Sequence, residues 1–228
     1  MIFFEYLLLN FNQDVETIIC YCVEAVGVDA IEQATGRHGG DAERGSIGHG
    51  GDAAAGAIEH GGGVSPGPDN REALAALRAD CLTNRRSIDL IVLHCTDTQP
   101  DRPFTIEQLR ACHRARGFGA WPGYHVYIRT DGTVHYCRPL DVVGCHVKGY
   151  NAHSIGVCYE GGHRPASADS GFGFVPYHGS DKWGDTRTMA QRSVMDQVVR
   201  LLLEYYPEAR VLGHNRLAAK ACPCFETE

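Results

Sequence analysis

The sequence predicts an α/β fold in which helices flank a central mixed β-sheet. Short aliphatic runs alternate with amphipathic helical segments from about residue 86 onward, and hairpin and crossover connections occur together between them. A hairpin joins antiparallel strands, whereas a crossover of a dozen or more residues joins parallel ones. A single sheet with both kinds of connection is therefore mixed. Residues 1–85 lack this alternation, and we expect them to form a poorly structured N-terminal extension.

The extension, residues 1–85, contains a glycine-rich repeat with a period of eleven residues. HGGDAERGSIG, HGGDAAAGAIE and HGGG begin at His38, His49 and His60. Three short copies so dense in glycine cannot bury a core, so a flexible linker is expected. A histidine-based metal tract is the alternative. A short helix is predicted over residues 72–82, still within the extension.

The predicted domain, residues 86–228, opens with a buried strand and a capped helix. The strand is IDLIVLHC, residues 88–95, whose length and aliphatic content are typical of a strand covered on both faces. The helix follows over residues 105–116. Thr105 and Gln108 have the spacing of a capping box, which marks its first turn.

A hairpin and a second buried strand come next. Strands over residues 124–129 and 133–138 flank Asp131-Gly132, a dipeptide strongly preferred in two-residue hairpin turns. SIGVCYE, residues 154–160, is again aliphatic enough for a buried strand.

The last part of the domain contains a long loop, a helix and a short strand. The loop over residues 163–184 is rich in glycine and aromatic residues, and its length is typical of functional loops; a plain surface excursion is the alternative. An amphipathic helix is predicted over residues 188–206, with Thr188 and Gln191 as its capping box. A short strand over residues 210–213 closes the pattern.

The charge of the chain is unevenly distributed. Residues 1–85 carry 5 Lys and Arg against 13 Asp and Glu, a net charge of −8. Residues 86–228 carry 16 against 15, a net charge of +1, and the two parts sum to the −7 of the whole chain. The acidity therefore belongs to the extension, and no nucleic-acid partner is expected.

The ten cysteines do not indicate a secreted disulfide scaffold. The first ten residues are apolar but lack a basic region and include Glu5, so they are not recognised as a signal peptide. A chain of this length can also bury a core without disulfides. We expect mostly free thiols and cytoplasmic synthesis. No uncharged run approaches the ~20 residues that span a bilayer, so no stable membrane insertion is expected.

Two histidines and a cysteine are candidate metal ligands. His94 ends the first predicted strand, His214 follows the last one, and Cys222 comes eight positions later. Ligands in α/β domains bind where strands end in loops. Two imidazoles and a thiolate leave a fourth tetrahedral position open, as in catalytic zinc sites. Unrelated core or surface histidines are the alternative interpretation of this spacing.

Five blocks in order along the chain carry a family resemblance: IVLHCTDTQP, WPGYHVYIRTDGTVHYCRP, GCHVKGYNAHSIGVCYEGG, DTRTMAQ and GHNRLAAKACPCF. Together they resemble the zinc-dependent N-acetylmuramoyl-L-alanine amidases of type 2, a family that includes phage lysozyme-type endolysins and peptidoglycan recognition proteins. The resemblance runs from about residue 86 to 225. It implies a single-domain zinc hydrolase that cleaves the bond between N-acetylmuramic acid and L-alanine.

The resemblance also assigns roles to individual residues. It implies that His94, His214 and Cys222 bind Zn²⁺, and that Tyr124 and Lys220 act in catalysis. It further suggests three substrate-binding residues in the GCHVKGYN block, namely His146, Lys148 and Asn151. At Cys224 the chain departs from the small polar residue usual in the family.

The expected partner is peptidoglycan or soluble muropeptides, and the protein is expected to be a monomer. Endolysin-like lysis of the cell wall, after release from the cytoplasm, is the leading function. A cytosolic amidase that recycles muropeptides is the nearest alternative, and a non-catalytic peptidoglycan-binding or regulatory protein is an alternative of a different class. A chain that begins near Arg86 is expected to behave as a complete enzyme.

Overall fold

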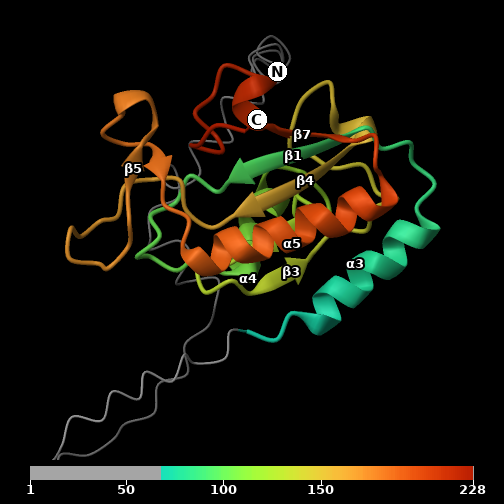
Figure 1. Ribbon diagram of the computed structural model, residues 1–228, viewed down its shortest axis with the longest axis horizontal. Helices are drawn as coiled ribbons and strands as arrows, with labels where there is room; N and C mark the ends of the chain where they lie inside the picture. The colour runs from blue at the N-terminus through green and yellow to red at the C-terminus, as the bar shows by residue number, and fades with distance from the viewer. Residues whose placement is uncertain (1–67, 228) are drawn as a thin grey trace, which may run out of the picture. The chain divides into compact units, whose positions relative to one another are not determined.

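Five strands form one sheet in the order β3-β2-β4-β1-β7 (Figure 1). The computed structural model describes residues 68–227, so the glycine-rich repeat and its three histidines lie outside the described residues. The strands are β1 (Leu90–Cys95), β2 (Val126–Ile128), β3 (Val134–Tyr136), β4 (Ser154–Tyr159) and β7 (Arg210–Gly213). Each lies within a segment that the sequence predicts as a strand.

The sheet is mixed, as predicted. β2 pairs with β4, β4 with β1 and β1 with β7, all in parallel. β3 is antiparallel to β2 because the two form the hairpin that turns at Asp131-Gly132. Gly132 has a φ of +88°, a conformation that a glycine adopts without steric cost. The four parallel strands end at the same edge of the sheet, where the candidate ligands lie.

Helices cover both faces of the sheet. The helices α3 (Arg71–Thr83) and α5 (Met189–Tyr205) pack on one face, where Figure 1 shows α5 lying across the strands with α3 beside it. α4 (Ile106–Ala115) packs on the other face, through a smaller apolar cluster. Alternation along β1 divides its side chains between the two faces, since Cys95 joins the core under α5 while His94 points away from it.

Both predicted capping boxes are present. At the start of α4 the Thr105 side chain accepts a hydrogen bond from the backbone N–H of Gln108, whose own side chain accepts from the N–H of Thr105. Thr188 and Gln191 make the same reciprocal pair at the start of α5. These bonds satisfy backbone donors that a helix start leaves without partners, so they fix where each helix begins.

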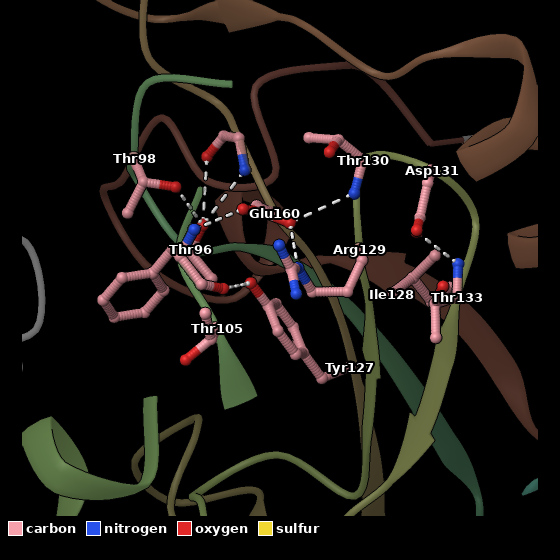
Figure 2. Close-up of polar contacts among 12 residues, drawn as sticks. Thr96, Thr98, Thr105, Tyr127, Ile128, Arg129, Thr130, Asp131, Thr133 and Glu160 are labelled. Carbon is pink, nitrogen blue, oxygen red and sulfur yellow. Dashed lines mark hydrogen bonds and ion pairs between the residues drawn. The ribbon is translucent and has the colours of Figure 1, made fainter. Parts of the chain in front are cut away.

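A buried carboxylate joins the α4 side of the molecule to the hairpin. Glu160, directly after β4, is 0% exposed and accepts hydrogen bonds from Arg129 Nε at 2.6 Å, the Thr130 N–H at 3.1 Å and the Phe104 N–H at 2.5 Å. Figure 2 shows these contacts meeting at the Glu160 side chain. The cation and the two N–H donors offset the free-energy cost of burying the Glu160 carboxylate. Glu160 can therefore fix the segment that leads into α4.

The helix α3 lies within the range 1–85 that the sequence analysis treats as an extension. Its Leu77 is 0% exposed and belongs to the main hydrophobic core, together with Cys81. The Asn70 side chain, just before the helix, donates to the Gly132 carbonyl at 2.9 Å and accepts from the Val134 N–H at 2.8 Å. Residues from 70 onward therefore pack as part of the domain.

The long loop after β4 has structure of its own. It holds the short paired strands β5 (Val175–Pro176) and β6 (Gly184–Asp185). Trp183 Nε1 donates to Asp97 Oδ1 at 2.9 Å, which ties this loop to the segment that follows β1. The loop is thus anchored beside the edge at which the parallel strands end.

Two further features of the described residues concern the cysteines and the lengths of the helices. All eight cysteines between residues 68 and 227 are free thiols. Within the same residues, no helix combines the length and the apolar character needed to cross a membrane.

Candidate metal centre

Parallel pairing of β1 with β7 brings His94 and His214 together. Leu93 is in register with Gly213, so the residues that follow these two in the sequence, both histidines, lie at the same level of the sheet edge. The two imidazoles stand edge to face, with ring centroids 4.8 Å apart. Both are buried, at 1% and 2% exposure. A separation of 120 positions in the sequence thus becomes direct contact.

Cys222 reaches the same point from the C-terminal turn. Its Sγ lies 3.6 Å from His94 Nδ1 and accepts a hydrogen bond from the Cys95 N–H at 3.3 Å. β1 therefore holds the thiol from two successive residues, one through its side chain and one through its backbone. Nothing in the sequence pattern indicates the backbone contact.

The three side chains fit a tetrahedral metal ion. Their ligand atoms all lie within 4.8 Å of one another, and zinc–nitrogen and zinc–sulfur bonds place tetrahedral ligand atoms about 3.6 Å apart. Among the described residues, buried His214 Nε2 has no hydrogen-bond partner. A metal ion would satisfy this lone pair, which otherwise carries a desolvation cost. The donor set of two nitrogens and one sulfur suits zinc.

Burial keeps both histidines in the neutral form that binds metals. It is the largest cause that lowers the pKa of His94 well below its ordinary value, followed by the neighbouring His214 and His146. Burial likewise lowers the pKa of His214 to about 4, with a further contribution from the positive charge of Lys220. Near neutral pH both rings therefore offer a lone pair without first having to lose a proton.

The Cys222 thiol, in contrast to the histidines, must lose a proton before it binds a metal, because the metal ligand is the thiolate. Burial raises the pKa of Cys222, so the thiol is protonated when no cation is near. A bound dication reverses this balance and deprotonates a coordinating thiol. Formation of the metal centre is therefore expected to release one proton.

Tyr124, one of the two predicted catalytic residues, lies at this centre, and the charge of Lys220, the other, acts on His214. Tyr124 is 4% exposed, precedes β2, and has its ring centroid 5.1 Å from that of His94. Burial is the largest cause that raises its pKa, so its hydroxyl stays a hydrogen-bond donor near neutral pH. Lys220 is close enough for its charge to lower the pKa of His214.

The backbone that carries Tyr124 is held by three hydrogen bonds. The Gly123 N–H donates to His113 Nδ1 at 2.8 Å, and the Gly123 carbonyl accepts from the Cys145 N–H at 2.9 Å. Arg138 Nη1 donates to the Pro122 carbonyl at 2.8 Å. A Cβ on Gly123 would lie 2.3 Å from the Cys145 carbonyl oxygen, so this close approach requires glycine.

The three predicted substrate-binding residues have different surroundings. His146 is 2% exposed, and its Nδ1 lies 3.0 Å from His94 Nε2. Asn151 Oδ1 accepts from the N–H groups of His146 and Val147, both at 2.9 Å. Lys148 is exposed. Substrate contact by these residues stays a prediction, while the contacts of His146 and Asn151 connect them to the metal centre.

Two residues adjacent in the sequence to predicted site residues, His125 beside Tyr124 and Cys95 beside His94, have structural roles. His125 is 0% exposed and accepts the Gly156 N–H at Nδ1. The side chain of Cys95 is in the core, where its Sγ lies 3.6 Å from that of Cys224. Neither belongs to the group of three ligand side chains found within residues 68–227.

Comparison with known proteins gives consistent matches. The profile of a family described as N-acetylmuramoyl-L-alanine amidase matches residues 84–225. The chain is 34% identical over 148 residues to an endolysin of Enterobacteria phage K11, covering 64% of this chain and 87% of that protein. It is 36% identical over 144 residues to an endolysin of Escherichia phage T7, covering 62% and 84%. A solved endolysin amidase from Clostridium intestinale URNW is 26% identical, with a TM-score of 0.48 over 62% of this chain and 78% of that one. The family match includes all three candidate ligands.

Proposed function

The chain belongs to the N-acetylmuramoyl-L-alanine amidase family, and we propose that it acts through a zinc ion held by His94, His214 and Cys222. As a member of this family it is a hydrolase that cleaves the amide bond between N-acetylmuramic acid and L-alanine of peptidoglycan. One observation carries the metal assignment, namely the convergence of two imidazoles and a thiol within 4.8 Å.

A zinc ion held by these residues would lower the pKa of a bound water molecule toward roughly 7 and would polarise the carbonyl that is attacked. The protein contributes charge and orientation. The Cys222 thiolate brings more negative charge to the centre than a third imidazole would. The Lys220 ammonium, which acts on His214 through its charge, offsets this and is suited to stabilise the oxyanion that develops on the carbonyl oxygen.

Tyr124 supplies a second hydrogen-bond donor. Its ring lies against His94, and the segment that precedes it is held by His113 and Arg138. A donor fixed in this way needs little reorganisation as charge develops on the oxyanion, which is why preorganised donors are effective. Tyr124 and Lys220 thus act on the same oxygen from different segments of the chain.

The setting that we propose is endolysin-like lysis of the cell wall by a monomer that is synthesised in the cytoplasm and acts after release. The similarity to two phage endolysins over more than four fifths of their length supports it. The near-neutral charge of residues 86–228 is also compatible with approach to an anionic wall.

The test compares two substrates, intact peptidoglycan sacculi and soluble muropeptides. We expect the purified zinc-loaded protein to solubilise sacculi and to release peptides whose new amino terminus is L-alanine. Turnover of soluble muropeptides alone would favour the recycling role and contradict the endolysin setting. Cys222→Ser is the matched control, since any wall lysis that persists in it does not come from this centre.

A further inference from the structure

His146 lies on the loop between β3 and β4, at the buried side of the metal centre. It is 2% exposed. Its Nδ1 lies 3.0 Å from His94 Nε2 and its Nε2 lies 3.4 Å from Ser154 Oγ. The ring stands edge to face against that of His94, with centroids 5.0 Å apart. Both ring nitrogens of His146 thus face polar atoms inside the protein.

The surroundings of His146 leave its ring little freedom. Asn151 Oδ1 accepts the backbone N–H groups of His146 and Val147, which fixes the loop at this point. A Cβ on Gly144 or Gly156 would lie within 2.8 Å of the imidazole ring. Two glycines therefore make the space that the ring occupies, one on its own loop and one on β4.

The direction of the hydrogen bond follows from the ligand geometry. His94 turns Nδ1 toward Cys222 Sγ, at 3.6 Å, so Nδ1 is the nitrogen that faces the metal position. A neutral imidazole whose Nδ1 lone pair binds a metal carries its proton on Nε2. That proton needs an acceptor in this buried place, and His146 Nδ1 is the atom at hydrogen-bonding distance.

We infer that His146 is a positioning residue for the metal ligand His94: its Nδ1 accepts the His94 Nε2–H and so holds His94 in the tautomer that presents Nδ1 to the metal. This inference rests on the metal centre of the proposed function and adds to it. The neutral His146 ring then carries its own proton on Nε2, which points toward Ser154 Oγ. The partner of a metal-bound histidine fixes both its orientation and its basicity. This role differs from the substrate contact predicted from the sequence, which stays a prediction.

The test is a pair of substitutions that differ in where they place an oxygen. In His146→Asn the side-chain oxygen is attached at the position of Nδ1 and can accept from His94. In His146→Gln it lies one bond further out, near the position of Nε2. We expect His146→Gln to weaken zinc binding by about 10- to 100-fold, the usual effect of losing a partner of a metal-bound histidine, and His146→Asn to restore most of it.

His113→Gln is the matched control. His113 is also a buried histidine, 5% exposed, whose Nδ1 accepts a hydrogen bond, but from the Gly123 N–H and not from a ligand. We expect this variant to lose thermal stability and to keep the wild-type zinc affinity in a chelator competition assay. Equal zinc affinities for His146→Gln and His146→Asn would overturn the inference.

A second readout does not depend on activity or on the variants. Nitrogen-15 NMR of the imidazole rings reports which nitrogen carries the proton, and we expect a His94 Nε2–H in both the metal-free and the zinc-loaded full chain. A proton on His94 Nδ1 would overturn the inference even if His146→Gln does not fold. Failure of the wild-type protein to bind zinc would instead reject the proposed metal centre, and the metal-free spectrum would still decide the His94–His146 bond.

Discussion

At the scale of single residues, two neighbours on β1 serve opposite faces of the sheet and still act on one cysteine. His94 presents its ring to Cys222, while Cys95 packs its side chain in the core and donates its N–H to the same sulfur. The alternation of side chains along a strand predicts that His94 and Cys95 face opposite sides of the sheet. It does not predict that the Cys95 N–H contacts Cys222, because a backbone contact with a distant turn leaves no pattern in the sequence.

Tyr124→Phe tests whether the tyrosine hydroxyl stabilises the oxyanion. Removing one such donor typically lowers kcat by about 10²- to 10³-fold, and we expect this loss with an unchanged zinc content. Tyr127→Phe is the control, because the Tyr127 hydroxyl donates to the Phe104 carbonyl away from the ligands and its loss should spare kcat. Full activity in Tyr124→Phe would contradict the assignment.

His113 predicts a pH dependence of stability. Burial, with a smaller effect of the Arg138 charge, lowers its pKa to about 4, against roughly 6.5 in an unfolded chain. Between these values the unfolded state binds a proton that the folded state does not. The free energy of unfolding therefore falls as the pH drops from about 6.5 to about 4, by an amount on the order of 3 kcal/mol for this group.

His113→Asn isolates this contribution, since the Asn oxygen can still accept the Gly123 N–H but does not titrate. Denaturant unfolding of the metal-free proteins at several pH values between 4 and 7 is the measurement. We expect the wild-type protein to lose stability more steeply than the variant as the pH falls through this range. Parallel curves would show that His113 is not held neutral by the fold.

At the scale of elements, the sequence predicts what is local. Both capping boxes and the Asp131-Gly132 hairpin follow from residues within a few positions of one another, and the structure contains all three. The pairing of β1 with β7 and the contact of His94 with His146 depend on segments far apart in the chain. The sequence identified their residues through a family resemblance, but not the hydrogen bond between the two rings.

The helix α3 illustrates the same limit. Its short apolar pattern predicts a helix over residues 72–82, but no local signal indicates that Leu77 reaches the core of a domain expected to begin at residue 86. Since Leu77 is fully buried, a chain that begins near Arg86 is now expected to expose the core around it. This differs from the expectation that such a chain is complete.

A pair of leucines in α3 tests this. Leu77→Ala removes a side chain that is 0% exposed, and we expect it to lower the free energy of unfolding by about 2–5 kcal/mol. Leu82→Ala removes a side chain from the same helix where the residue is 71% exposed, and its effect should stay within about 0.5 kcal/mol. Equal effects in the full chain would mean that α3 does not belong to the folded domain.

At the scale of the whole molecule, the parallel part of the sheet explains why the centre is where it is. β1 carries His94 one residue before its end, His214 directly follows β7, and the C-terminal turn returns Cys222 to the same edge. The α4 side then supplies Tyr124, and the β3–β4 loop supplies His146 behind the ligands. Five separate segments thus build one centre, so its assembly depends on the complete fold.

Metal removal and return is the measurement that tests the central claim most directly. The purified full chain is stripped with a chelator, its zinc content is measured, and hydrolysis of peptidoglycan is followed before and after stoichiometric zinc is added. We predict loss of activity on stripping, recovery at one zinc per chain, and no recovery in Cys222→Ser. Full hydrolysis by the zinc-free protein would contradict a zinc amidase built on His94, His214 and Cys222.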